Sequence, residues 1–463
     1  MADTHPSDWF VSVHTSASSF IDEGVETVLD NIQTLAKANT VTVIPHSFNP
    51  EIIDRPERYA GHGGRLPHRS AGGYFASPNP EYYKGIALGD ARVKEDMFAG
   101  FDVLAETIPR ARARGLGIHL YIMESASTGG RQRNVAGFPR LLEVDAFGRR
   151  AVLPCVNHPD YRAWKLALIE DLYKSYDFDG LLWGVERWGP LHIALCGDTP
   201  TCFCAHCGAL ARNAGLDWAR TIYGYRALGL AMNDWRQAGA GSDVPFMSFM
   251  RLMLKYPELI AWEARWTESY LSLHREIYGT AKWLAPEKPF GLGIWHYYFI
   301  NPLLHAEWNL AEFAASADFL RPILYHLPEG ARINHYLDSL RNGLFSHRAA
   351  QDLWDSFSQV LGLDLPPVSG LSANGLPAEY VAQGIRIVRQ ASADLRPIYA
   401  GIGVDVPEQG LDRDMTADDI SRALAAAASA GADGITISRN YAEMRLESLA
   451  AVGDALDQVR QGG

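Results

Sequence analysis

Short apolar runs alternate with longer amphipathic segments along most of this chain. The runs are rich in valine, isoleucine, leucine and aromatic residues, and each has the length of one buried strand. Helical periodicity fills much of the sequence between them, for example at 97–114 and 160–175. This alternation is typical of repeated strand–helix units that form a parallel sheet. The eight runs cover residues 10–14, 41–45, 117–123, 180–185, 290–295, 319–325, 398–402 and 434–437.

Two of the runs begin in the same way, four strands apart. Asp177-Phe-Asp-Gly-Leu-Leu leads into the fourth run, and Gly431-Ala-Asp-Gly-Ile-Thr leads into the eighth. In both, Asp-Gly predicts a tight turn from a helix into a buried strand. The repeat favours an eightfold barrel over an open doubly wound sheet, and the Gly-x-Gly-x-x-Gly pattern does not follow the first run. We therefore predict an α/β fold, a (β/α)8 TIM barrel.

Two long excursions interrupt the alternation, at about 187–285 after the fourth strand and at 327–392 after the sixth. Neither is bounded by a linker rich in proline, glycine and serine. We predict that residues 1–463 form a single barrel domain with these two insertions. Long loops after barrel strands build functional sites, because the C-terminal ends of the strands all open on one face.

Composition and charge narrow the range of partners. Of the 463 residues, 47% are hydrophobic, which is enough for a large core. The formal net charge is −12 and no run of Lys and Arg occurs, so we expect neither a nucleic-acid nor a membrane partner. Residues 1–10 lack the pattern of a signal peptide, and no stretch of eighteen apolar residues occurs. We predict a cytoplasmic protein, while a leader absent from this sequence and a homo-oligomer stay open.

A polar or ionisable residue follows each predicted strand. In a barrel these positions converge on one pocket from all sides. The alternative explanation is that strand ends are polar simply because loops begin there. The eight residues are His14, His46, Glu124, Glu186, His296, His326, Asp405 and Arg439.

Glu186 gives the clearest chemical signal in this series. It ends the run Leu-Leu-Trp-Gly-Val-Glu at 181–186 and is followed by Arg187 and Trp188. An apolar wall such as Trp183 or Trp188 would raise the pKa of the glutamate and favour a role as proton donor. The structural alternative is an ion pair between Glu186 and an arginine.

Hydrolysis of a glycosidic bond requires a proton donor such as Glu186 and a second carboxylate. Asp405, after the seventh strand, and Glu124, after the third, are the two candidates for the second carboxylate. Aromatic rings and histidines near the strand ends are expected to contact the substrate, and the chain contains 12 Trp. The predicted substrate-binding residues are His14, His46, Trp188, Trp295, His296, Tyr325, His326 and Arg439.

Three cysteines lie within six residues, at Cys202, Cys204 and Cys207. This spacing allows three thiolates to reach one tetrahedral metal ion, and a closed structural site needs a fourth ligand. Cys155 and Cys196 are the candidates, with His206 a poorer one. A set of buried free thiols is the alternative. An ion bound only by thiolates is expected to be structural zinc that holds the loop after the fourth strand.

A glutamate at the end of the fourth strand, followed by Cys-x-Cys-x-x-Cys, resembles the zinc-containing beta-galactosidases of the large retaining (β/α)8 glycoside-hydrolase clan. The resemblance covers roughly residues 115–215 and extends to uncharacterised bacterial glycosidase-like barrels. It implies a carbohydrate or glycoside substrate, Glu186 as acid/base, and Cys155 as the fourth zinc ligand. Two positions depart from the clan, which has Asn where this chain has Val185 and Glu near the position of Asp405.

Two other functions are compatible with the same barrel. His46, Glu124, Glu186 and His296 could hold a divalent cation, as in a metal-dependent sugar isomerase, epimerase or lyase. The barrel could also be a carbohydrate-binding protein that lacks catalytic activity. The first alternative requires a metal in the pocket, and the second requires binding without turnover.

Overall fold

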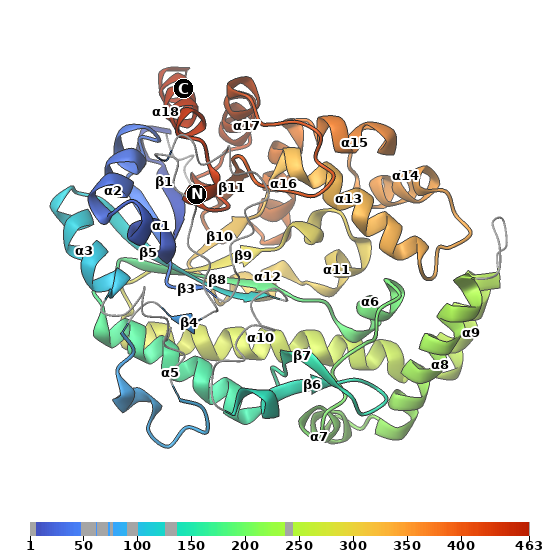
Figure 1. The fold of residues 1–463 in the computed structure, drawn as a ribbon. Helices are drawn as coiled ribbons and strands as arrows, with labels where there is room; N and C mark the ends of the chain where they lie inside the picture. The colour runs from blue at the N-terminus through green and yellow to red at the C-terminus, as the bar shows by residue number, and fades with distance from the viewer. Residues whose placement is uncertain are drawn as a thin grey trace.

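Eight parallel strands and the helices between them form the body of the protein (Figure 1). The computed structural model describes residues 6–47, 62, 73–74, 77–89, 101–125, 137–236 and 244–462. Each predicted apolar run contains one strand, so the prediction of a (β/α)8 barrel is confirmed. The strands are β1 (Phe10–Ser16), β2 (Thr40–Ile44), β5 (Gly117–Ser125), β8 (Gly180–Glu186), β9 (Phe290–Ile294), β10 (Phe319–Pro322), β11 (Tyr399–Gly403) and β12 (Gly434–Ser438).

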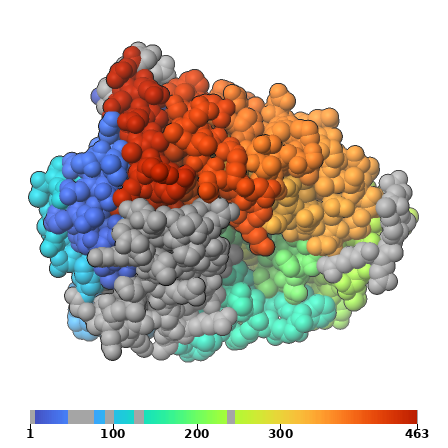
Figure 2. Space-filling view, turned by 45° about the horizontal axis from the view of Figure 1, so that its top comes forward, coloured from blue at the N-terminus to red at the C-terminus, as the bar shows by residue number. Residues whose placement is uncertain are grey.

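The strands pair in the order β10-β9-β8-β5-β2-β1-β12-β11. Two bridges between the outer strands, Leu320 with Ile398 and Ile323 with Gly401, nearly close this sheet into a barrel. Because β1 pairs with β12, the first and last parts of the chain lie against each other. Figure 2 shows this as the contact between the blue N-terminal and red C-terminal segments.

The bottom of the barrel is filled by aromatic rings. Phe10 stacks on Tyr399 with ring centroids 4.4 Å apart, and His119 and Phe319 complete the layer. Glycine provides the space for these rings, since a Cβ at Gly180 would come within 2.7 Å of the His119 ring. This packing explains why bulky residues and glycines share the inner face of the strands.

The Asp-Gly turns found in the sequence fix the strand starts. The carboxylate of Asp179 accepts a hydrogen bond from the backbone N–H of Ile118 over 2.7 Å, and Asp433 accepts one from Ile398 over 2.9 Å. Each aspartate therefore ties its own strand to the start of the neighbouring strand. The similarity between the two sequence segments reflects the same structural role.

Helices occupy both predicted insertions, and Figure 1 shows the α8–α9 part of the first extending to one side of the barrel. None of the described helices is both long and apolar enough to cross a membrane. The single-domain assignment stays a prediction. The first insertion contains α6 (Pro190–Leu195), α7 (Ala205–Asn213), α8 (Trp218–Arg236), α9 (Val244–Lys255) and α10 (Glu258–Leu284), and the second contains α13 (His326–Arg341), α14 (Ala350–Leu361), α15 (Val368–Asn374) and α16 (Glu379–Ala391).

The remaining elements surround the barrel or connect its strands. The predicted helix at 160–175 is confirmed, and α3 matches the described part of the helix predicted at 97–114, of which residues 97–100 lie outside the described residues. The connecting helices are α1 (Ala17–Asp22), α2 (Val25–Thr34), α3 (Val103–Ala113), α5 (Pro159–Ser175), α11 (Pro302–Glu307), α12 (Leu310–Ala314), α17 (Ala417–Ser429) and α18 (Leu446–Gly462). Two short hairpins pair β3 (His46–Ser47) with β4 (Gly73–Tyr74), and β6 (Leu142–Val144) with β7 (Arg150–Pro154).

Candidate active site

The alternation of side chains along β8 places Glu186 on the inner face of the barrel. Leu182 of β8 packs against Tyr121 of β5 in a cluster inside the barrel. Glu186 is four residues after Leu182, so it faces the same way at the C-terminal end of the strand. Gly184, between them, makes room for Tyr121, because a Cβ there would lie 2.6 Å from the tyrosine Oη. The Glu186 side chain is partly exposed, as required for contact with a ligand.

Burial raises the pKa of Glu186, whereas nearby positive charges act in the opposite direction. In decreasing order these charges belong to His296, Arg332, Arg321 and Arg439. The effect of burial is the larger, and the net result is a raised pKa. A raised pKa keeps a carboxyl group protonated closer to neutral pH, where it can donate a proton. The surrounding cations would stabilise the carboxylate that remains after the donation.

A buried carboxylate holds His296 in place. His296 begins the short helix η7 (His296–Phe299) after β9, and its Nδ1 lies 2.6 Å from Oε1 of Glu329 in α13. Glu329 is fully buried, and Nη1 of Arg332 lies 3.6 Å from its Oε2. Arg332 Nε donates a hydrogen bond to Oε2 of Glu408 over 2.6 Å. This network fixes two of the positive charges that act on Glu186.

Arg321 brings a third positive charge into the barrel interior, where its side chain is fully buried. Its Nε donates to Oγ1 of Thr436 over 2.9 Å, and its Nη2 donates to Oη of Tyr325 over 3.0 Å and to Oγ of Ser438. Nδ1 of His14 lies 3.3 Å from the same Ser438 hydroxyl. Burial and the charge of Arg321 lower the pKa of His14, so this histidine is neutral. The predicted residues His14 and Tyr325 therefore lie in the interior with Arg321.

Trp188 lies at the centre of an aromatic cluster. Its ring stacks on His192 with centroids 3.7 Å apart and lies 4.4 Å from the rings of both Trp295 and Tyr297. Tyr336 of α13 is nearly parallel to Trp188 and His192. Trp188 and Tyr297 are partly exposed, whereas the other three rings are buried. An amphipathic aromatic surface of this kind suits one face of a sugar ring.

Glu124 does not face this pocket, so its position gives no support to the predicted role as the second catalytic carboxylate. Its neighbour Met123 packs toward the interior cluster, so Glu124 points to the outside of the barrel. There Tyr161 Oη donates to Oε1 over 2.5 Å, and Lys165 Nζ lies 3.0 Å from Oε2. All three side chains are buried. Glu124 is therefore part of a structural ion pair between β5 and α5.

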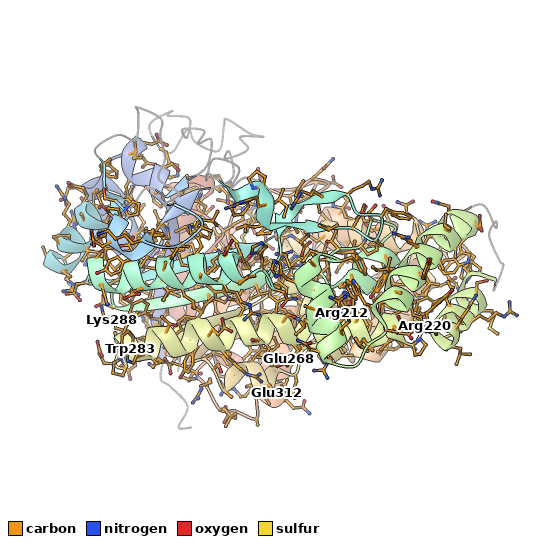
Figure 3. All side chains as sticks on the ribbon, turned by 90° about the horizontal axis from the view of Figure 1, so that it is seen from below. Arg212, Arg220, Glu268, Trp283, Lys288 and Glu312 are labelled. Carbon is orange, nitrogen blue, oxygen red and sulfur yellow. The ribbon has the colours of Figure 1, made fainter. Side chains whose placement is uncertain are left out.

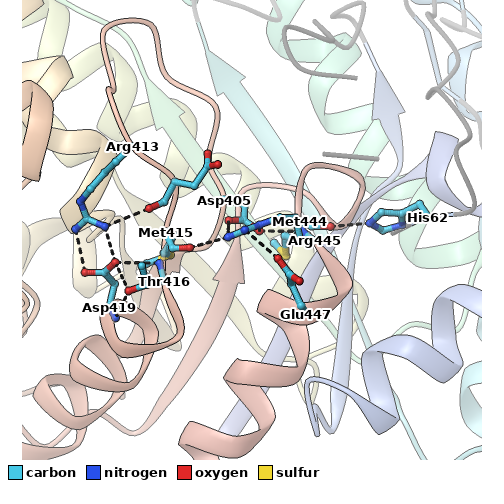
Figure 4. Close-up of polar contacts among 10 residues, drawn as sticks. His62, Asp405, Arg413, Met415, Thr416, Asp419, Met444, Arg445 and Glu447 are labelled. Atoms are coloured by element: carbon cyan, nitrogen blue, oxygen red, sulfur yellow. Dashed lines mark hydrogen bonds and ion pairs between the residues drawn. The ribbon is translucent and has the colours of Figure 1, made fainter. Parts of the chain in front are cut away.

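Asp405, the other candidate, is bound by Arg445 (Figure 4). The backbone N–H and Nε of Arg445 donate to Oδ2 over 2.8 and 3.2 Å, and Nη2 donates to Oδ1 over 3.0 Å. Asp405 is buried and has a positive φ of 49°, so the chain turns away from the strand direction at this residue. Asp405 is thereby held in the loop after β11, and its role as the second carboxylate stays a prediction.

Two of the predicted substrate contacts also change. His326 begins α13 rather than following a strand, because β10 ends at Pro322. It is buried, and the charges acting on it belong to α16, to α17 and to Arg413 before α17, so its position gives no support to a substrate contact. The side chain of His46 lies outside the described residues. Arg439 does reach the pocket, where it is about half exposed and donates to Oε1 and Oε2 of Glu443 over 3.1 and 3.0 Å.

Four cysteines form a compact cluster. Cys155 Sγ lies 3.5 Å from the Sγ of Cys207 and 3.6 Å from that of Cys204. Sulfur ligands around a tetrahedral zinc ion lie roughly 3.8 Å apart, given a Zn–S distance of about 2.3 Å. Cys196 lies elsewhere, 3.5 Å from Nε2 of His192. The four sulfur atoms of Cys155, Cys202, Cys204 and Cys207 all lie within 4.8 Å of one another. The donor type and the spacing thus fit a closed metal site.

Arg187 connects this cluster to the strand that carries Glu186. Its side chain is buried on the outer face of the barrel, where Nη1 donates to the carbonyl oxygen of Pro154 over 2.7 Å. Nη2 donates to Glu143, which also accepts a hydrogen bond from Thr201. Pro154 and Thr201 each directly precede a cysteine of the cluster. The cysteine site is therefore mechanically coupled to the end of β8.

Sequence analysis missed four charged residues of the pocket and its network: Arg321, Glu329, Arg332 and Glu408. A signal existed for Arg321, because a lone arginine inside the apolar run Phe-Leu-Arg-Pro-Ile-Leu is costly to bury without a function or partners. The others lie in α13 and in the loop after β11. Their place in the pocket depends on how these segments pack, which no local pattern shows.

Comparison with solved structures identifies the same fold in glycoside hydrolases. The PgaB (BpsB) glycoside hydrolase domain from Bordetella bronchiseptica is 13% identical, with 98% of each chain covered and a TM-score of 0.52. A polyextremophilic beta-galactosidase from Halorubrum lacusprofundi is 14% identical with a TM-score of 0.54, covering 97% of this chain and 58% of that one. An alpha-L-fucosidase isoenzyme from Paenibacillus thiaminolyticus is 13% identical with a TM-score of 0.52, covering 97% and 49%.

These similarities confirm the resemblance at the level of the fold. The chain spans nearly the whole PgaB domain but only about half the length of the galactosidase and fucosidase chains. No protein-family model matches the chain, and no curated protein matches its sequence. What the chain shares with these glycoside hydrolases is therefore the (β/α)8 barrel fold.

Proposed function

We propose that the protein is a glycoside hydrolase in which Glu186 donates a proton to the departing oxygen. The position of Glu186 carries this proposal: it is the strand-end carboxyl group on the inner face of β8, its pKa is raised, and cations surround it. Such an environment favours proton donation and then stabilises the resulting carboxylate. The glycosidase-like fold supports a carbohydrate substrate.

The surrounding residues divide into two groups under this proposal. His296, Arg439 and Tyr325 offer polar groups that can bind substrate hydroxyl or carboxylate groups. Trp188 and Trp295 provide an aromatic surface against which a sugar ring can pack. Glu329 does not touch the substrate but positions His296 through the 2.6 Å contact with Nδ1.

Glu408 is the best candidate for the second carboxylate. It comes from the loop after β11, the seventh barrel strand, and its side chain is 20% exposed. Glu329, by contrast, is fully buried against His296, and Asp405 is held by Arg445. Arg332 interacts with Glu408 and also acts on the charge of Glu186, which supports a common pocket for the two glutamates.

We further propose that Cys155, Cys202, Cys204 and Cys207 bind structural zinc. Four thiolate ligands leave no open coordination position for a substrate, so the ion would stabilise the segments around it. Arg187 would transmit this support to the end of β8. The metal-dependent isomerase alternative has less support, because Glu124 and Glu186 lie on opposite faces of the barrel wall.

A panel of aryl glycosides tests the proposal directly. We expect turnover of at least one substrate. Chelation of loosely bound metal should change this turnover little. Elemental analysis must show that the zinc of the cysteine site remains after the chelation. The Asp405→Asn variant serves as a control at a neighbouring carboxylate outside the reaction. Loss of turnover after chelation would favour the metal-dependent enzyme. Sugar binding without turnover of any glycoside would favour the non-catalytic barrel.

A further inference from the structure

A second cavity lies outside the barrel, among the helices of the two insertions. Its volume is about 710 Å³, within the range of small-molecule sites. The wall is mainly apolar and comes from α6, α9, α10, α13 and α14 of the insertions and from α11 and α12. His192 and Tyr336, two rings of the aromatic cluster around Trp188, also line this cavity, so the cluster forms part of its wall.

The charged residues of the cavity wall all have the same sign. Glu263, Glu268, Glu307 and Glu312 line it, and neither Lys nor Arg does. Glu268 and Glu312 lie near each other in Figure 3, and Arg275 partners both, at 3.0 and 3.6 Å. The carboxyl groups that lack a cationic partner among the described residues are therefore those of Glu263 and Glu307.

Glu263 and Glu307 are hydrogen-bonded to each other, and Glu263 is supported further by the backbone. Glu263 is buried, and its Oε2 accepts a hydrogen bond from the backbone N–H of Leu191 over 2.7 Å. Oε1 of Glu307 is shielded from solvent and has no hydrogen-bond partner among the described residues. Burial raises the pKa of both carboxyl groups, and the charge of Glu263 and its hydrogen bond with Glu307 raise the pKa of Glu307 to about 10, so the two groups share a proton near neutral pH. A buried polar atom without a partner is costly, and a ligand can remove that cost.

We propose that this cavity binds a small amphiphilic amine, whose ammonium group pairs with Glu307 and whose apolar body fills the space lined by Phe249 and Met253. The ammonium would donate a hydrogen bond to the unpartnered Oε1 and balance the negative charge left on the Glu263–Glu307 pair. A neutral alcohol would supply only a donor, and a carboxylate would add repulsion. This site is independent of the proposed glycosidase activity.

The mouth of the cavity contains exposed apolar side chains, including Phe246, Met250 and Ile260. Such a patch also suits contact with a second copy of the chain. A second copy would not require a cationic group at Glu307, whereas the amine would. Binding of the amine therefore depends on the charge of the ligand, and association of two copies does not. Sedimentation at several protein concentrations distinguishes them from each other.

Calorimetric titration with octylammonium, 1-octanol and octanoate, each below its aggregation concentration, tests the proposal. We expect octylammonium to bind about tenfold or more tightly than octanol, a difference of about 1.4 kcal/mol, and octanoate to bind most weakly. Glu307→Gln should abolish most of the preference for the amine. Glu268→Gln is the matched control, because that carboxylate lines the same cavity but already pairs with Arg275.

Glu307→Gln removes a carboxyl group that is unfavourably buried, so we expect the variant to fold, and its melting temperature checks this. Thr267→Trp, which fills the cavity from α10, should weaken binding of all three probes. Three results would each overturn the proposal. They are equal affinity for octylammonium and octanol, a preference for octylammonium that survives Glu307→Gln, and absence of binding. A concentration-dependent dimer that is lost in Phe246→Asp, without amine binding, would assign the face to a second copy.

Discussion

Replacing Glu124 with glutamine is expected to destabilise the protein without removing a catalytic group. Among the described residues, Glu124 is the one carboxylate within salt-bridge distance of Lys165, and the two side chains are each 2% exposed. The variant would leave the Lys165 ammonium buried without its counter-charge. Removing one partner of a buried ion pair typically costs about 3–5 kcal/mol.

The size of the effect on melting follows from the length of the chain. Unfolding entropy near 60 °C is about 2.1 cal/mol/K per residue, so the 463 residues give roughly 1 kcal/mol/K. A loss of about 3–5 kcal/mol therefore corresponds to a decrease in melting temperature of about 3–5 °C. Differential scanning calorimetry measures this shift, and Glu170→Gln is the control because its pair with Lys174 is solvent-exposed.

Activity separates this interpretation from a catalytic role. Glu124→Gln should retain a kcat within about threefold of the wild type at a temperature where both are folded. A loss on the order of a hundredfold or more, with an unchanged melting temperature, would refute the outward orientation of Glu124. It would also restore Glu124 as a candidate second carboxylate.

Four further predictions concern the metal site and the pocket. Elemental analysis should find about one zinc per chain, and Cys204→Ser should lose both metal and stability; five reactive thiols and no metal in the native protein would contradict this. Trp188→Ala should raise KM more than it lowers kcat, because it removes a binding surface, and an unchanged KM would exclude the ring from binding. The pKa of Glu186 is raised and its acid form is the active one, so activity should decrease as the pH rises through that pKa, at a pH above the usual glutamate pKa. A wild-type kcat/KM profile without this decrease at higher pH would contradict the role of Glu186 as proton donor. Glu408→Gln should lower turnover of all glycosides alike, whereas full activity would remove it as the second carboxylate.

The fold was predictable because its information is local. Each apolar run and each Asp-Gly turn reports on a few neighbouring residues, and eight such units leave little choice of architecture. Glu186 was predictable for the same reason, since it ends a strand whose inner face is set by alternation. Tyr325 and His326 lie beyond β10, which ends at Pro322, so the alternation of that strand could not separate them.

The proposed second carboxylate, Glu408, and the cations near Glu186 were not predictable in this way. Asp405 lies beyond the end of β11 and has a left-handed backbone conformation, so the alternation of the strand does not extend to it. Glu329 and Arg332 reach the pocket from α13, inside an insertion. Their positions result from the packing of that helix on the barrel, which involves contacts far apart in the sequence.

The most direct test of the central claim compares two leaving groups in the Glu186→Gln variant. Glutamine keeps the shape of the side chain but cannot protonate the departing oxygen. For a substrate with a poor leaving group we predict a loss of activity on the order of a hundredfold or more. For an activated aryl glycoside, whose phenolate departs with little help, the loss should be much smaller. Equal losses on both substrates, with partial recovery on addition of Mn²⁺ or Zn²⁺, would contradict the role of Glu186 as proton donor.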